Sequence, residues 1–164
     1  MTDVEANRAI VERIFNEVLN GGDFSVSDAL VAEDAKFYTH ARPAPFVGPA
    51  GFREYIGAVR TGMPDTRVEV HETVAERDTV IAHWTLHGTH TGNLLGIPPT
   101  GSVVALEALE LVHLRDGKLT EIRLLMDGMS IMQQLGVIPA GEKIPLPLIL
   151  MLRAKLALKR LRRS

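Results

Sequence analysis

The chain has 164 residues and a hydrophobic fraction of 46%, which is enough for one domain with a substantial core. It has no cysteine, which excludes disulfides, thiolate metal sites and cysteine nucleophiles. All 20 acidic residues lie in 1–142, so the body of the chain is strongly negative and disfavours nucleic acid as the main partner. No basic segment followed by an apolar run opens the chain, and the longest apolar run, 144–152, is shorter than the about 20 residues that a membrane span needs. We therefore expect a cytoplasmic protein.

The first third of the chain predicts helices interrupted by one short strand. Apolar residues at helical spacing predict a first helix that ends at Gly21–Gly22, and a short helical turn is expected at 27–32. A short strand is expected at 36–40. Pro49 is suited to the first turn of the next helix, whose predicted core face holds Phe52, Ile56 and Val59.

The remaining sequence predicts an antiparallel sheet and a final short helix. Strands are expected near 68–70 and over 79–89, 102–114 and 119–126, with turns at Arg77–Asp78 and Asp116–Gly117 and a helix at 128–136. Helices followed by a meander of strands predict an α+β domain in which a curved sheet wraps over the helices. Such an arrangement leaves a pocket between the sheet and the helices.

The segment GTHTGNLLGIPPTG, residues 88–101, joins two of these strands and is far longer than a hairpin needs. Its glycines permit sharp turns, and its paired prolines stiffen it. We expect this loop to close one end of the cavity, with His90 and Leu94–Leu95 over the mouth. The alternative is that the loop only connects the strands and packs on the helices.

A two-residue turn at Asp116–Gly117 predicts the register of the last hairpin. Arg115 would face Lys118, and Glu110 would then face Arg123 on the same sheet face as Asp127. Glu110 and Arg123 would form a cross-strand ion pair, or Arg123 would bind a substrate oxygen if that face lines the cavity. A bulge would exchange the two faces. Because both faces are partly apolar, we expect the uncovered one to form a homodimer.

Two further polar features have competing interpretations. Asp127 stands where a strand ends and a helix begins, so it is a helix N-cap, a general base among apolar neighbours, or both. His40 precedes a proline-rich loop and either contacts ligand or has a surface or capping role. His83 and His87 share a strand face, but no carboxylate is spaced to complete a metal site, so no metal is expected.

Three stretches, GTHTGNLLGIPPTG, LRDGKLTEIRLLMD and MQQLG, resemble the SnoaL-like polyketide cyclases, often called ester cyclases, of the NTF2-like superfamily. The resemblance implies a cone-shaped fold over 1–138 and ring closure by an intramolecular aldol step without metal or cofactor. It implies that Asp127 takes and returns the proton. We expect the substrate-binding residues to be His40, Trp84, His90, Glu110 and Arg123.

The resemblance leaves the substrate and the activity open. This chain reads EIRLLMD where relatives often read E-H-W-x-x-x-D, so Ile122 and Arg123 replace a histidine and a tryptophan. We expect a cyclase or isomerase for a small hydrophobic carbonyl compound. The alternatives are a non-enzymatic protein that binds a small hydrophobic ligand, and an epoxide hydrolase-like enzyme.

Residues 139–164 form a predicted basic C-terminal extension beyond the resemblance. Residues 143–164 carry seven lysines and arginines and no acidic residue, and apolar side chains recur there at helical spacing. A basic amphipathic helix of this kind is suited to weak contact with an anionic membrane surface through 147–163. The alternative is that the extension docks on the acidic body of the chain or on a partner subunit.

Overall fold

The computed structural model describes residues 3–39 and 42–139. Four α-helices, a π-helix and six strands are assigned in this part of the chain. In chain order they are α1 (Val4–Arg13), η1 (Ile14–Asn20), α2 (Phe24–Leu30), β1 (Val31–Tyr38), β2 (Phe46–Val47), α3 (Gly48–Gly62), β3 (Arg67–Glu76), β4 (Thr79–Thr89), β5 (Val103–Arg115), β6 (Lys118–Met126) and α4 (Gly128–Gln134).

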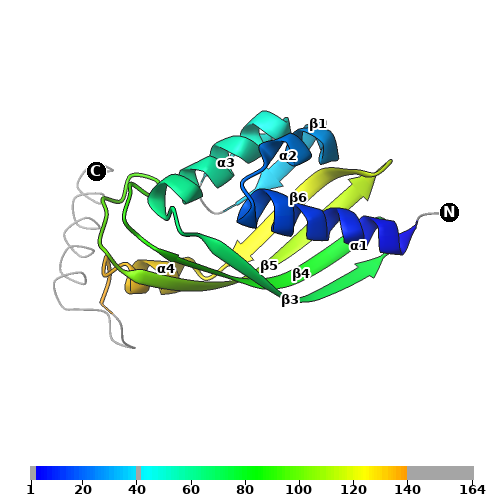
Figure 1. Cartoon of the computed structure of the whole chain (residues 1–164). Coiled ribbons are helices and arrows are strands. Elements are labelled where there is room, and N and C mark those ends of the chain that lie inside the picture. The colour runs from blue at the N-terminus through cyan, green and yellow to red at the C-terminus, as the bar shows by residue number, and fades with distance from the viewer. Residues whose placement is uncertain (1–2, 40–41, 140–164) are drawn as a thin grey trace, which may run out of the picture.

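The strands form one open, curved sheet in the order β2-β1-β6-β5-β4-β3, and α1, α2 and α3 lie together on one of its faces (Figure 1). All neighbouring strands are antiparallel except β1 and β6, which are parallel. The α+β prediction of a curved sheet over N-terminal helices is confirmed. The sheet has two more strands than the predicted meander, because β1 and β2 extend it beyond β6.

The core lies between the sheet and the three covering helices. The helical face of α1 and η1 buries five apolar side chains, Val11, Ile14, Phe15, Val18 and Leu19, and α3 buries Phe52, Tyr55 and Ile56. The inward residues of β4, β5 and β6 alternate with exposed ones, as expected for strands with one buried face.

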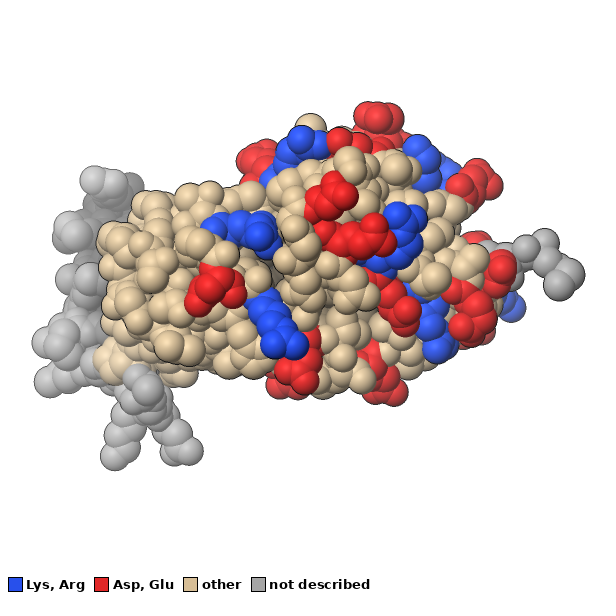
Figure 2. Space-filling view, viewed as in Figure 1, with Lys and Arg blue, Asp and Glu red and all other residues tan. Residues whose placement is uncertain are grey.

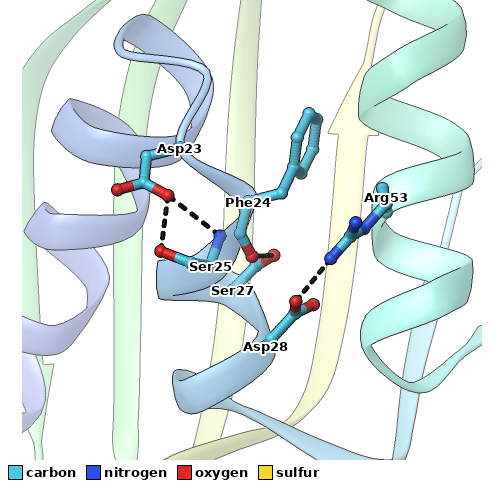
Figure 3. Close-up of polar contacts among 6 residues, drawn as sticks. All are labelled: Asp23, Phe24, Ser25, Ser27, Asp28 and Arg53. Carbon is cyan, nitrogen blue, oxygen red and sulfur yellow. Dashed lines mark hydrogen bonds and ion pairs between the residues drawn. The ribbon is translucent and has the colours of Figure 1, made fainter.

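Polar contacts cap α2 and tie it to α3 (Figure 3). The Asp23 carboxylate caps α2 by accepting hydrogen bonds from the backbone N–H of Ser25 at 3.0 Å and from its hydroxyl at 2.6 Å. Asp28, near the other end of α2, forms an ion pair with Arg53 of α3, whose guanidinium also lies 5.5 Å from the ring centre of Phe24. The short helix α2 is thereby tied to the helix that forms one wall of the site.

The predicted register of the β5–β6 hairpin is correct at the turn and wrong beyond it. Asp116 and Gly117 have φ of 53° and 72°, as a type I′ turn requires, and Arg115 pairs with Lys118. A register shift follows at Thr120, so that Glu110 pairs with Leu124 and not with Arg123. A one-residue shift moves every following side chain to the opposite face.

This shift corrects the expected Glu110–Arg123 pair. Arg123 lies on the outer face of the sheet, where it forms an ion pair with Glu121 at 2.6 Å and its guanidinium lies 4.3 Å from the ring centre of Tyr38. Glu110 points the other way, toward the helices, and is buried.

Two sequence predictions fall on parts of the chain that are not described. His40 and nearly all of the predicted extension, residues 139–164, lie outside the described residues. Within 3–39 and 42–139, no helix has the length and apolar character required to cross a membrane.

Candidate functional site

A pocket of about 390 Å³ lies between the inner face of the sheet and the helices. Its walls come from η1, α3, the inner face of β1 and of β3 to β6, the loop between β4 and β5, and α4. Nearly all lining side chains are apolar, among them Phe37, Phe52, Tyr55, Met63, Trp84, Leu94, Leu106, Leu124 and Leu135. This composition is suited to a small hydrophobic molecule.

The loop at 90–102 builds one end of the pocket. The backbone N–H groups of Thr91 and Gly92 donate to the carbonyl of Gly62 at 3.1 and 2.9 Å, which satisfies an unpaired group at the end of α3. Leu94 and Ile97 exchange backbone hydrogen bonds of 3.0 and 2.9 Å around a tight turn, and both line the pocket together with Leu95. The predicted placement of Leu94–Leu95 at the end of the cavity agrees with the structure.

His90 holds the base of this loop and is not among the residues that line the pocket. Its backbone bonds to Ser102 and Gly101, each at 2.9 Å, and its ring Nδ1 lies 3.0 Å from the Thr100 hydroxyl and accepts from the Thr100 N–H at 3.3 Å. The side chain is fully buried within the loop. The expected contact of His90 with ligand therefore has no support from its position.

Among the described residues of the pocket wall, Glu110 is the one carboxylic acid. It is 7% exposed, lines the pocket from β5, and has Ala82 and Leu124 as its neighbours on the adjacent strands. Burial raises the pKa of Glu110 from 4.5 to about 7, because an apolar wall solvates the charged form poorly. A carboxyl group with this pKa exists in both protonation states near neutral pH.

Two polar ring systems lie near Glu110. The indole N–H of Trp84 faces this carboxyl and offsets part of the rise in its pKa, although it forms no hydrogen bond of ordinary geometry. Tyr55 lines the pocket from α3. Burial, together with the negative charge of Glu110, raises the pKa of Tyr55 to about 12, so its hydroxyl stays protonated.

Asp127 begins α4 as its N-cap. Its Oδ1 accepts hydrogen bonds from the backbone N–H groups of Met129 at 2.9 Å and Ser130 at 3.1 Å. The residue is exposed and does not line the pocket, whereas its neighbours Met126 and Gly128 do. The N-cap interpretation is thus correct, and the carboxylate lies at the pocket's edge and not in its wall. The catalytic role of Asp127 stays a prediction.

Of the six expected site residues, the structure brings Trp84 and Glu110 together in the pocket. It places Asp127 beside the pocket, Arg123 on the opposite sheet face and His90 inside the loop. Sequence reasoning missed Tyr55. Its spacing from Phe52 and Ile56 places it on the same helical face, which is the signal that would have found it.

The described residues that build the end of the molecule with the pocket-closing loop include few charged groups. Residues 88–106 and 128–139 contain no Asp, Glu, Lys or Arg. In Figure 2 the charged side chains gather over the rest of the molecule, and the surface near α4 and the loop is almost uncharged. The described part of this surface is therefore compatible with an apolar ligand.

The model of the SnoaL-like polyketide cyclase family matches residues 9–135. The chain is 33% identical over 90 residues to the nogalonic acid methyl ester cyclase of Streptomyces nogalater, a segment that covers 54% of this chain and 67% of that enzyme. It is 32% identical over 90 residues to the aklanonic acid methyl ester cyclase AcmA of Streptomyces galilaeus, covering 54% of this chain and 62% of that enzyme.

Solved structures agree on the fold. A SnoaL-like polyketide cyclase homologue from Jannaschia sp. CCS1 superposes with a TM-score of 0.76 at 24% identity, covering 85% of this chain and 98% of that one. AclR from Streptomyces galilaeus superposes with a TM-score of 0.73 at 24% identity, covering 98% of both chains. With the family model matched over most of its length, the chain belongs to the SnoaL-like polyketide cyclase family.

Proposed function

We propose that this protein is a cofactor-independent cyclase or isomerase that acts on a small, apolar carbonyl compound by acid–base chemistry. Its family and the two ester cyclases that it resembles support ring closure as the reaction class. The almost entirely apolar lining of the pocket supports a hydrophobic substrate.

The observation that carries the proposal is the buried Glu110. A group that removes a proton from carbon and later returns it works best when its pKa lies near the working pH. Burial gives Glu110 a pKa of about 7, and its side chain lies in the wall of the pocket where a substrate would bind. We assign the proton-transfer role to Glu110 on this ground.

The reaction can be written with one carboxyl group. Glu110 takes a proton from the carbon next to a carbonyl, and the resulting enolate carbon attacks a second carbonyl carbon in the same molecule. A carbon–carbon bond forms, the carbon–oxygen π bond opens to an alkoxide, and this oxygen takes the proton back from Glu110. The step is redox-neutral, so it needs no oxidant or reductant.

Asp127 is the competing candidate for the same role. The family resemblance assigns the proton transfer to it, and it adjoins two lining residues, Met126 and Gly128. Both of its backbone hydrogen bonds end on Oδ1, so Oδ2 is not used in capping α4. A comparison of Glu110→Gln with Asp127→Asn separates the two assignments, because both changes remove a charge and keep the shape.

Hydrogen exchange tests proton abstraction without knowledge of the natural substrate. The probe is 1-tetralone, a small apolar ketone, incubated in D₂O at pH 7, with NMR following the loss of the protons next to its carbonyl. We expect the wild-type protein to accelerate exchange, Glu110→Gln to abolish the acceleration and Asp127→Asn to retain it. The reverse pattern would transfer the role to Asp127.

The alternative is a binding protein that carries a small hydrophobic ligand without chemical change. The small number of polar groups in the pocket wall favours this second candidate. It predicts that 1-tetralone binds to the wild-type protein while its exchange rate stays at the rate in buffer. Faster exchange that depends on Glu110 or Asp127 would exclude it.

A further inference from the structure

We propose that the indole N–H of Trp84 binds the carbonyl oxygen of the ligand, and so places the adjacent carbon beside Glu110. This inference rests on the proposed function, because it assigns the atom that holds the substrate during proton transfer. It also defines the ligand class as apolar compounds that present a carbonyl or enol oxygen to the inner face of the sheet.

The first observation is an unpartnered donor in the pocket wall. Trp84 is 3% exposed and lines the pocket, yet its Nε1 has no hydrogen-bond partner among the described residues. An indole nitrogen can only donate, and buried donors are almost always paired. A ligand oxygen would supply the missing acceptor.

Two other polar side chains of the wall, Arg60 and Thr66, differ from Trp84 in this respect. Arg60 donates through Nη1 to the carbonyl of Leu19 at 2.8 Å, and the hydroxyl of Thr66 donates to the carbonyl of Met63 at 2.6 Å. These bonds tie both side chains to the protein's own backbone. No bond of this kind to the backbone is found for the Trp84 Nε1 among the described residues.

The second observation is the position of the donor relative to the carboxyl group. Trp84 pairs with Ala108 and Glu110 pairs with Ala82, so the two residues are diagonal neighbours on the inner face of β4 and β5. The indole of Trp84 lowers the pKa of Glu110, as expected for a donor group beside that carboxyl. If the carbonyl oxygen of a ligand binds at Nε1 of Trp84, the carbon next to that carbonyl therefore lies close to Glu110.

The indole ring is held in place from behind. Phe15 of η1 contacts it edge-on, with 5.8 Å between the ring centres and 61° between the ring planes. As the proton leaves the carbon, negative charge moves onto the carbonyl oxygen. A hydrogen-bond donor held in a fixed position stabilises this charge. The hydrogen bond from Trp84 would thus strengthen along the reaction.

The titratable groups around this point are few. Tyr55 and Arg60, both from α3, are the other titratable side chains among the described lining residues, and β6 contributes the apolar Leu124 opposite Glu110. The Arg60 guanidinium is bound to Leu19 and forms no ion pair with Glu110 among the described contacts. Binding of an uncharged ketone is therefore governed by the donor and by the state of Glu110.

The test compares 1-tetralone with tetralin, which has the same two rings without the carbonyl. Trp84 is the sole tryptophan, so the indole gives a single ¹H–¹⁵N signal in the wild-type protein. We expect 1-tetralone to move this proton signal downfield at pH 7 and to bind more tightly than tetralin. An indole signal that responds equally to both compounds would overturn the proposal without any variant.

Variants supply the second arm of the test, with affinities measured by calorimetry. Trp84→Phe should lower the affinity for 1-tetralone relative to tetralin by roughly two- to tenfold, the usual effect of one hydrogen bond. Phe52→Leu, which removes the aromatic ring of another lining residue, should lower the affinity for both compounds equally. Equal losses for both compounds in Trp84→Phe would also overturn the proposal. Because binding is measured apart from hydrogen exchange, a missing exchange activity would contradict the proposed function and leave this result intact.

Discussion

Replacing Glu110 with glutamine should remove a pH-dependent loss of stability that the wild-type protein carries. The pKa of Glu110 is raised by burial from 4.5 to about 7, so the folded protein holds this proton more tightly than the unfolded chain does. Below pH 4.5 Glu110 is protonated in both the folded and the unfolded state, so its raised pKa does not lower the free energy of unfolding there. As the pH rises toward 7, the unfolded chain loses the proton first, and the folded state becomes progressively less stable.

The size of the effect follows from the shift in pKa. Each unit corresponds to about 1.4 kcal/mol, so a rise from 4.5 to about 7 corresponds to about 3 kcal/mol of lost stability once the pH exceeds 7. Glutamine keeps the shape and cannot ionise. We therefore expect Glu110→Gln to match the wild-type protein near pH 4.5 and to exceed it by about 3 kcal/mol near pH 8.

Urea unfolding from pH 4.5 to 8.5 measures this difference. The comparison is made between the two proteins at each pH, because other carboxylates titrate equally in both. Glu72→Gln, at an exposed position on β3, is the control and should follow the wild-type protein throughout. A stability difference between Glu110→Gln and wild type that does not change with pH would refute the reasoning, since it would mean that Glu110 is not desolvated in solution.

Three further predictions follow from the packing. Gly57→Ala should stabilise α3 by up to about 1 kcal/mol, because an added Cβ meets nothing within 4 Å. Gly62→Ala should destabilise the protein by about 1–3 kcal/mol, because its Cβ would lie 2.7 Å from the Leu94 side chain of the pocket-closing loop. Thermal unfolding measures both changes. Asp127→Ala should cost about 1 kcal/mol in urea unfolding through loss of the N-cap, and Asp127→Asn should cost much less. Leu109 and Leu125 pair on the outer sheet face and are 47% and 57% exposed, so we expect a homodimer through this face. Light scattering at micromolar concentration should give a dimer mass for the wild-type protein and a monomer mass for Leu109→Glu. A monomeric wild-type protein would contradict this prediction.

The sequence by itself determined the features that depend on neighbouring residues. Turn residues placed the hairpins at Arg77–Asp78 and Asp116–Gly117, and the glycine pair at Gly21–Gly22 ended the first helical segment. Asp127 was identifiable as a helix N-cap because capping needs only a short polar side chain at the first turn. The family was identifiable from the loop and hairpin segments, and the matched model confirms it.

Only the tertiary structure decided which side chains enter the pocket. The shift at Thr120 turned Arg123 outward and set Glu110 opposite Leu124, and nothing in the local sequence marks that bulge, because it depends on how β6 fits between β5 and β1. The same long-range packing brought Tyr55 of α3 toward Glu110 and enclosed His90 in its loop. A one-residue shift exchanges the two faces of a strand, so a site on a sheet is fixed by pairing between strands and not by the order of residues within one.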